Sequence, residues 1–474
     1  MGRTDSIAPA VVAAPVPVTR EQDHADRAAQ VLLKLLLPLA LLHGLLYLAV
    51  VPPWQHADEP THFEYARLIA LWNRQPALNE HDLATNREIA DSMYRFRFWK
   101  PGVRPDLLGA QPPNIGFDEK VHPPLYYAIA AVPVRWLRFL SVETQLYAAR
   151  MISVALYMLV IVCAWRIAAI VAPERPVTQL VVPLIVALVP AFADEMSAVN
   201  NDALVNFSTA TLLLGCVLLI RDGPQPLPLG LAVLSLVVAV LAKRTALVSV
   251  PLFGLAVFWS LWHRPLRWWV WVAAIVTLSL IVGFATLQYS AAGWAIRPWL
   301  ADLDRQYLRI SLDRIVASVT DWERNRRVYP LLIDILFGTF WLRFGWGHVR
   351  MGWGWERMML GVVLAGALGL VAAMVRTQRS LALWQRRSIW LFVVSVIITW
   401  CAALARSQFE TSSFLSAGRY MHLAMLPTIW LLVFGFEGLV PRRWQAYAQF
   451  GLTVFFVLLD TTAWAYTLTT FYYR

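Results

Sequence analysis

The sequence has 474 residues, of which 58% are hydrophobic and 15% are charged. A soluble domain carries about 25% charged residues, so this composition excludes an ordinary soluble protein and indicates helices that cross a bilayer. The formal net charge of +11 does not require a nucleic-acid partner, because Lys and Arg gather on the cytoplasmic loops of membrane proteins. The three cysteines all lie inside apolar runs and predict neither a disulfide framework nor a metal site.

The first part of the sequence is predicted to form a tail, one span and a large external region, in that order. Residues 1–27 are predicted to form a disordered cytoplasmic tail, and 28–474 a single transmembrane domain. The first span is expected at 30–51, followed by an external region at about 52–149. Within this region, residues 124–140 are apolar but short and contain two arginines, which indicates a helix lying in the interface rather than a span.

Ten more apolar runs follow, so that the fold class predicted is an all-α, polytopic bundle of about eleven transmembrane helices. These runs are 150–171, 177–193, 203–220, 227–242, 245–262, 268–290, 356–375, 388–405, 420–439 and 447–470. A second external region at 291–355 is expected to contain an amphipathic helix at 301–328. In this arrangement the Arg-rich turns at 376–387 and 442–443 face the cytoplasm, whereas a span at 124–140 would turn them outward, against the positive-inside rule.

Four groups of polar residues lie at the outer ends of these helices. The first is Asp58-Glu59-Pro60-Thr61-His62-Phe63. Two carboxylates before a proline are typical of a helix N-terminus, but a carboxylate held beside apolar helices also suits a general base. Both interpretations remain open from the residues alone.

The second group is His122-Pro123-Pro124-Leu125-Tyr126-Tyr127, and the third runs from Asp194-Glu195 to Asn201-Asp202. A loop histidine before a helix start, and a polar loop between two spans, are ordinary features. Asp202 is less ordinary, because an acid at the mouth of a span is costly.

The fourth group consists of cations that the positive-inside rule does not explain, namely Lys243, Arg244, Arg406 and Arg419. Snorkelling toward lipid headgroups explains any one of them equally well. Together they favour a bound phosphate-bearing lipid. The residues thus predict an external site with carboxylates and phosphate-binding cations.

The motifs in this order resemble those of the GT-C superfamily of membrane glycosyltransferases, and of a bacterial subfamily with a DEPxHF signature after the first span. The resemblance rests on DEPTHF at 58–63, HPPLYY at 122–127, SAVNND at 197–202, the Lys243 region, FWLRFGWG at 340–347 and AGRY at 417–420. It implies a GT-C fold with juxtamembrane helices in the external loops. It also implies transfer of a monosaccharide from a polyprenyl-phosphate donor to a hydroxyl acceptor on the periplasmic face of the bacterial inner membrane.

The resemblance also implies roles for particular residues. Asp58, with Glu59 beside it, would be the catalytic base. The donor phosphate and sugar would be bound by His62, His122, Tyr126, Asn201, Asp202, Lys243, Arg244, Arg419 and Tyr420. No cofactor is expected, and a divalent metal is left open but is not expected, because the metal-dependent members carry further acids and a soluble C-terminal domain that this sequence does not show. The alternative is a flippase for lipid-linked sugars or a polysaccharide transporter, which would place charges at mid-membrane in discontinuous helices.

Overall fold

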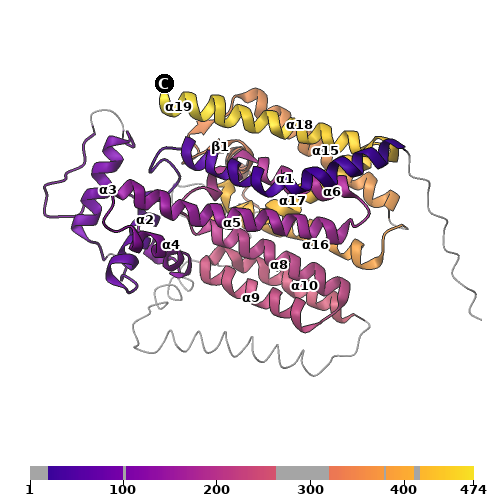
Figure 1. Cartoon of the computed structure of the whole chain (residues 1–474), viewed down its shortest axis with the longest axis horizontal. Coiled ribbons are helices and arrows are strands. Elements are labelled where there is room, and N and C mark those ends of the chain that lie inside the picture. Colours follow the sequence, from indigo (N-terminus) through magenta and orange to yellow (C-terminus); the bar gives the residue numbers. More distant parts are fainter. Residues whose placement is uncertain (1–19, 79, 100–102, 263–319, 378–379, 410–416) are drawn as a thin grey trace, which may run out of the picture.

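Nearly all of the described chain is helical, and most helices run along the long axis of the molecule (Figure 1). The computed structural model describes residues 20–78, 80–99, 103–262, 320–377, 380–409 and 417–474. Helices α2, α3 and α4 gather at one end of this bundle (Figure 1). The bundle therefore has one end built from helices of the long loop between α1 and α5.

The first half of the chain forms the following elements in order: α1 (Arg20–Val50), α2 (Glu59–Trp72), α3 (Leu83–Arg95), the 3₁₀ helix η1 (Glu119–Val121), α4 (Leu125–Trp136), α5 (Val142–Val171), α6 (Pro176–Leu188), α7 (Pro190–Met196), α8 (Asp202–Asp222), α9 (Pro226–Ala242), the 3₁₀ helix η2 (Arg244–Ser249) and α10 (Val250–Leu261). The second half forms α14 (Trp322–Trp341), strands β1 (Arg343–Phe344) and β2 (Val349–Arg350), α15 (Trp353–Thr377), α16 (Leu383–Phe409), the 3₁₀ helix η3 (Gly418–Ala424), α17 (Met425–Leu439), the 3₁₀ helix η4 (Arg442–Trp444), α18 (Gln445–Thr462), the π-helix η5 (Ala463–Leu468) and α19 (Thr469–Tyr473). The two strands pair antiparallel.

Apolar helices long enough to cross a bilayer confirm that the chain is a multi-pass helical membrane protein. The described residues contain seven such helices, and the bent pair α6 and α7 makes up to eight. Two shorter apolar helices, Lys34–Val50 and Pro226–Ala242, coincide with predicted spans. The predicted span at 268–290 lies outside the described residues, as does most of the amphipathic helix predicted at 301–328.

Several helix boundaries differ from the sequence prediction. Helix α1 begins at Arg20, inside the tail predicted for 1–27, of which residues 1–19 lie outside the described chain. Helix α5 begins at Val142 rather than at residue 150, because the hydroxyl of Ser141 accepts a hydrogen bond from the Thr144 amide and caps the helix.

The predicted span at 177–193 is broken rather than continuous. Helices α6 and α7 meet at an angle of 68°, because Pro190 has no amide hydrogen to continue the α6 ladder. Helix α4 covers 12 residues, or about 18 Å. It is too short to cross a hydrocarbon core of about 30 Å, in agreement with the prediction that 124–140 is not a span.

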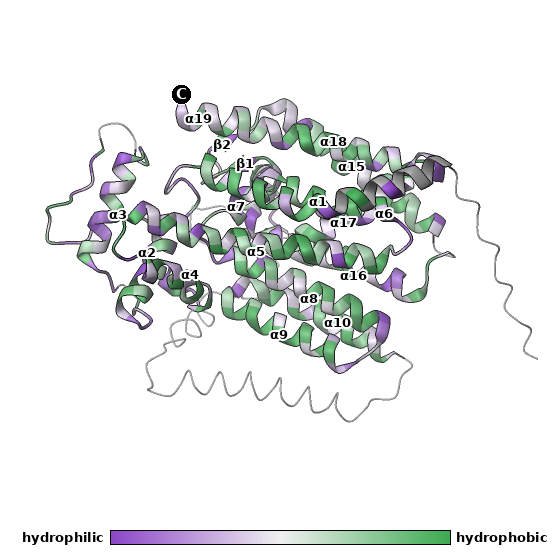
Figure 2. Cartoon of the chain, in the orientation of Figure 1, coloured by the Kyte–Doolittle hydropathy of each residue, from purple (hydrophilic) through white to green (hydrophobic). Residues whose placement is uncertain are grey.

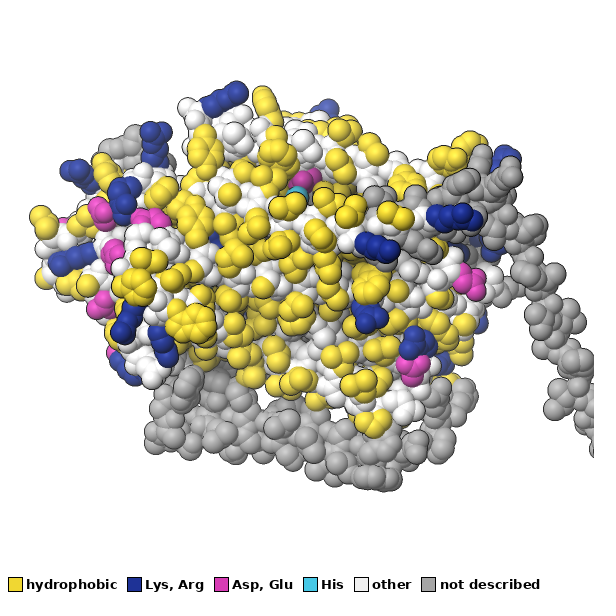
Figure 3. Space-filling view, in the orientation of Figure 1, with side chains coloured by type: hydrophobic (Ala, Val, Ile, Leu, Met, Phe, Trp, Pro, Cys, Tyr) yellow, Lys and Arg dark blue, Asp and Glu magenta, His cyan; other side chains and the backbone are white. Residues whose placement is uncertain are grey.

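Hydrophobic side chains cover the middle of the bundle, and charged side chains gather at its two ends (Figures 2 and 3). On α15, for example, Leu364, Leu368 and Val375 are all more than half exposed. In a membrane these apolar side chains face lipid rather than water, so their exposure on the bundle surface has no free-energy cost.

The end of the bundle opposite α2–α4 is held together by polar contacts around Glu437. Arg175 forms an ion pair with Glu437, and the Thr178 hydroxyl donates to the same carboxylate at 2.8 Å. Arg376 donates to the Gly438 carbonyl at 2.9 Å. Arg376 and the turn at Arg442–Arg443 are therefore separated from the α2–α4 end by the length of the apolar helices (Figure 1).

Candidate functional site

Asp58 lies at the junction of α1 and α2, and its carboxylate points away from the helix that it precedes. Its backbone is left-handed, with φ 59° and ψ 6°, and its side chain makes no capping hydrogen bond to α2. The carboxylate Oδ2 instead accepts a hydrogen bond from Arg419 on η3. This ion pair holds the carboxylate of Asp58 in a mostly buried place, with 11% of the side chain exposed.

Glu59, the neighbouring acid, is engaged by a different partner. Arg150 on α5 donates from Nη2 to Glu59 Oε2 at 2.6 Å and from Nε to Oε1 at 2.8 Å. The amides of Trp54 and Val199 donate to the same carboxylate. Burial acts to raise the pKa of Glu59, but the charge and hydrogen bonds of Arg150, the nearby His56 and the Val199 amide together outweigh it, and this pKa lies below its ordinary value. Glu59 is thus a fully enclosed, ionised group with no free oxygen for a substrate.

A second ion pair lies beside Asp58. It joins Asp202, the first residue of α8, to Lys243, the C-cap residue of α9. Lys243 Nζ lies 2.6 Å from Asp202 Oδ1. The same ammonium lies 5.0 Å from the ring centroid of Tyr420, and the Arg419 guanidinium lies 5.4 Å from it. Cations within about 6 Å of an aromatic face are attracted to it, so Tyr420 places the two predicted phosphate-binding cations side by side.

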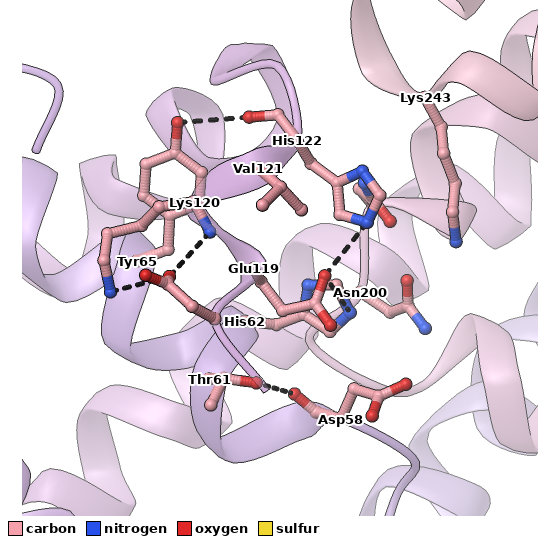
Figure 4. Close-up of polar contacts among 12 residues, drawn as sticks. Asp58, Thr61, His62, Tyr65, Glu119, Lys120, Val121, His122, Asn200 and Lys243 are labelled. Atoms are coloured by element: carbon pink, nitrogen blue, oxygen red, sulfur yellow. Dashed lines mark hydrogen bonds and ion pairs between the residues drawn. The ribbon is translucent and has the colours of Figure 1, made fainter. Parts of the chain in front are cut away.

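A third set of polar groups comes from α2 and from the segment before α4. Figure 4 shows the side chains of His62, Glu119 and His122 pointing toward one another, with Lys243 beside them. His122 Nε2 lies 3.0 Å from Glu119 Oε2, and His62 Nε2 lies 3.9 Å from the same oxygen. His62 Nδ1 lies 2.8 Å from the Tyr127 hydroxyl. Burial lowers the pKa of His62 to about 4, so its imidazole is neutral near pH 7.

Three other predicted site residues make mainly structural contacts. The Tyr126 hydroxyl lies 2.8 Å from Ser153 Oγ and accepts from the Asn200 amide at 3.0 Å. The Asn201 side chain donates to the Ala242 carbonyl at 3.2 Å. Arg244 donates to the Val121 carbonyl at 3.2 Å, which joins η2 to the residue before His122.

The acids of α7 and of the start of α8 have different partners. Asp202 joins the Lys243 pair, whereas Asp194 Oδ1 lies 3.0 Å from His56 Nδ1 and Glu195 pairs with His422. The stretch from Asp194 to Asp202 is therefore not one acidic patch. The side chain of Arg406 lies outside the described part of the chain.

Sequence reasoning missed two buried charged residues of this region. Glu119 sits three residues before the predicted His122, and Arg150 sits at the start of an apolar run. A charged residue at the start of an apolar run is the signal that could have identified Arg150. Nothing in the sequence distinguishes Glu119 from the other acids of its loop.

Three side chains of this site have the chemistry of metal ligands. One donor atom each of Asp58, His62 and Glu119 lies within 4.8 Å of the other two. Two carboxylates and an imidazole suit divalent first-row metals. No metal is expected from the sequence motifs, so they did not predict this grouping.

No family model and no curated protein sequence matches the chain. Three solved structures of an oligosaccharyltransferase from Archaeoglobus fulgidus match 92% of it. The apo form matches with a TM-score of 0.48 and 11% identity, and the form tethered to an acceptor peptide with 0.45 and 10%. The complex of AglB with an inhibitory peptide and a dolichol-phosphate matches with 0.42 and 11%. The chain spans 55–56% of the length of these structures, and similarity at this level does not bear on its activity.

Proposed function

We propose that this chain is a GT-C type glycosyltransferase that moves a monosaccharide from a polyprenyl-phosphate donor to a hydroxyl acceptor, with inversion. The supporting observation is the meeting of Asp58, Arg419 and the Lys243–Asp202 pair at one end of apolar helices. A carboxylate beside two cations offers a proton acceptor and a phosphate site within one partly buried cluster. The order of motifs from 58 to 420 in the sequence supports the same assignment.

In the proposed reaction, Asp58 takes the proton of the acceptor hydroxyl. The acceptor oxygen forms a bond to the anomeric carbon of the sugar, and the bond from that carbon to the phosphate oxygen breaks. Polyprenyl phosphate leaves with the electron pair of that bond. Lys243 and Arg419 stabilise the negative charge that grows on the leaving phosphate, which is the kind of electrostatic effect that often dominates catalysis.

We propose that the other predicted site residues position or support these groups. Glu59 has both oxygens engaged by Arg150, so we assign it to positioning Asp58 rather than to proton transfer. Tyr420 orients the two cations. Residues that line or support the donor side of the same cluster are His62, His122, Tyr126, Asn201, Asp202 and Arg244.

The proposed location is the bacterial inner membrane, with the N-terminus in the cytoplasm and the site on the extracytoplasmic side. The turns that contain Arg376 and Arg442–Arg443 lie at the end of the bundle opposite the site. Cytoplasmic loops carry an excess of Lys and Arg, and this supports placing the opposite end, with Asp58, outside.

The experiment is to incubate the purified protein with a panel of radiolabelled polyprenyl-phosphate sugars and a crude cell-envelope acceptor fraction. Release of free polyprenyl phosphate and binding of each donor are measured in the same samples. We expect turnover with at least one donor, and loss of turnover with retained donor binding in Asp58→Asn. Full activity of Asp58→Asn would contradict the base assignment, and absence of binding to every donor would contradict the glycosyltransferase proposal.

A matched control is Asp91→Asn in the same loop region. Asp91 forms an i,i+4 pair with Arg95 on α3, and about half of each side chain is exposed. Removing this charge changes a solvated surface pair, which contributes little. Unchanged turnover in Asp91→Asn shows that the effect of Asp58→Asn comes from the position of the charge.

A transporter of lipid-linked sugars is the second candidate, and one observation favours it. The 68° break between α6 and α7 makes a discontinuous helix of the kind that transporters use. Donor movement across the bilayer of proteoliposomes, with no release of polyprenyl phosphate, would favour the transporter. Release of polyprenyl phosphate without movement would favour the enzyme.

A further inference from the structure

Glu119 is a buried carboxylate whose close charged partners are two imidazoles. It is 9% exposed, and among the described residues its ion pairs are with His62 and His122. A buried carboxylate is costly to leave uncompensated. Lys243, which lies beside Glu119 in Figure 4, is itself paired with Asp202, so a further cation would balance Glu119.

The three potential ligand atoms converge from separate segments. A donor atom of Asp58, one of His62 and one of Glu119 all lie within 4.8 Å of one another. Two ligands at about 2.1 Å from one ion lie no more than about 4.2 Å apart, so an inward shift of about half an ångström completes such a site.

Each of these side chains is held by a partner outside the trio. His62 Nδ1 lies at hydrogen-bond distance from the Tyr127 hydroxyl, and when this nitrogen donates its proton, Nε2 presents a lone pair. Asp58 is held by Arg419, and Glu119 by His122. Metal-binding histidines and carboxylates are ordinarily oriented by such outer contacts.

An independent observation points to the same place. Asp202 Oδ2 is buried and has no hydrogen-bond partner in the described chain, although Oδ1 is paired with Lys243. Its partner Lys243 lies beside His62 and Glu119 in Figure 4. An unpaired carboxylate oxygen beside the trio is what a cation, or a water bound to it, would satisfy.

We propose that Asp58, His62 and Glu119 bind a divalent cation, with His122 and Asp202 as outer partners. One nitrogen and two carboxylate ligands suit Mn²⁺ or Zn²⁺, since imidazole favours the later metals and carboxylates the harder ones. The catalytic part of this inference rests on the proposed function: a cation beside Asp58 lowers the pKa of an acceptor hydroxyl.

The test is direct metal binding to the full chain in detergent, without any substrate. Protein stripped with EDTA is titrated with Mn²⁺, and free Mn²⁺ is followed by its six-line electron paramagnetic resonance signal. We expect one Mn²⁺ per chain, and affinity lowered at least about ten-fold in Glu119→Gln and in His62→Asn. The asparagine keeps a donor near the Nδ1 position that faces Tyr127 and removes Nε2.

The matched controls are His81→Ala and Glu88→Gln, one for each ligand type. His81 pairs with Glu64, and Glu88 pairs with Arg67, in the same part of the chain. Both controls should bind Mn²⁺ as the unaltered protein does. Thermal unfolding with and without Mn²⁺ is measured for every variant, and a shift by Mn²⁺ that is lost only in the two ligand variants supports the site even where these are less stable.

Absence of Mn²⁺ and Zn²⁺ binding at millimolar concentration, or equal binding by ligand variants and controls, overturns the metal site. Turnover of donor that is unchanged after EDTA treatment overturns its catalytic role and leaves the glycosyltransferase proposal standing. Stoichiometric Mn²⁺ binding without donor binding supports the metal site and counts against the glycosyltransferase.

Discussion

Arg150 and Glu59 form an ion pair in which both side chains are completely enclosed. The guanidinium of Arg150 also donates to the carbonyls of Leu48, Val51 and Pro52 at 2.8–3.0 Å. One side chain on α5 thus fixes the end of α1, the loop after it and the first turn of α2. Because Asp58 lies between these fixed segments, its position depends on a residue that does not contact it.

Replacing Glu59 with Gln should strongly destabilise the protein. The change leaves the Arg150 guanidinium buried without a charged partner, and breaking such a pair costs about 3–5 kcal/mol. The measurement is unfolding in detergent, followed by circular dichroism. The control is Arg74→Ala, since Arg74 pairs with Glu80 at the surface and its loss should not measurably change the unfolding midpoint. Equal midpoints for Glu59→Gln and Arg74→Ala would contradict the structural role of the pair.

Arg419→Lys should lower donor turnover by at least about ten-fold although the charge is kept. A guanidinium presents a planar fork, and its partner Asp58 and the Tyr420 ring use that geometry. A lysine ammonium cannot make both contacts from the same position. The assay is release of polyprenyl phosphate, with Arg443→Lys in η4 at the opposite end of the bundle as the matched control. Full activity in Arg419→Lys would show that charge alone is required there.

Apolar run length predicted most of the fold, because a helix that crosses lipid needs about 20 apolar residues whatever its neighbours are. The break between α6 and α7 was not predicted, although Pro190 lies at it, since prolines inside apolar runs also occur in continuous helices. Helix α5 starts at Val142 because Ser141 caps it and its first turn contacts α3, where Ser92 and Arg95 bind Glu143. Such contacts cannot be read from hydropathy.

The candidate site was predicted only where residues are informative by type and position. Asp58, Lys243 and Arg419 stand out because charges beside the ends of apolar runs are uncommon, and the structure brings them together. Glu59 was grouped with Asp58 because the two are adjacent, yet they have different partners, since Glu59 starts a helix and Asp58 precedes it in a left-handed conformation. Glu119 enters the site only through the path of a loop, which sequence spacing does not determine.

Asp460→Leu should destabilise the bundle by about 1–2 kcal/mol, because polar contacts between membrane helices are worth little more than this. Asp460 on α18 accepts from the Tyr47 hydroxyl at 2.7 Å and lies 2.8 Å from His43 Nε2. His43 Nδ1 in turn lies 3.1 Å from the Tyr157 hydroxyl. The network therefore links α1, α5 and α18. Unfolding in detergent measures the loss. Thr462→Leu on the same helix should show none, since among the described residues that exposed hydroxyl bonds only to the Leu458 carbonyl of its own helix.

Gly369→Ala should destabilise the contact between α15 and α17, whereas Gly361→Ala on the same helix should not. A Cβ at Gly369 would lie 2.1 Å from the carbonyl oxygen of Gly435, while a Cβ at Gly361 would meet nothing within 4 Å. Small residues let membrane helices approach closely, and overpacking a tight contact costs about 1–3 kcal/mol. Gly361→Ala should instead stabilise the helix by up to about 1 kcal/mol, because alanine has the higher helix propensity. Unfolding midpoints in detergent decide this: a Gly369→Ala protein as stable as Gly361→Ala would mean that α15 and α17 do not pack through their glycines.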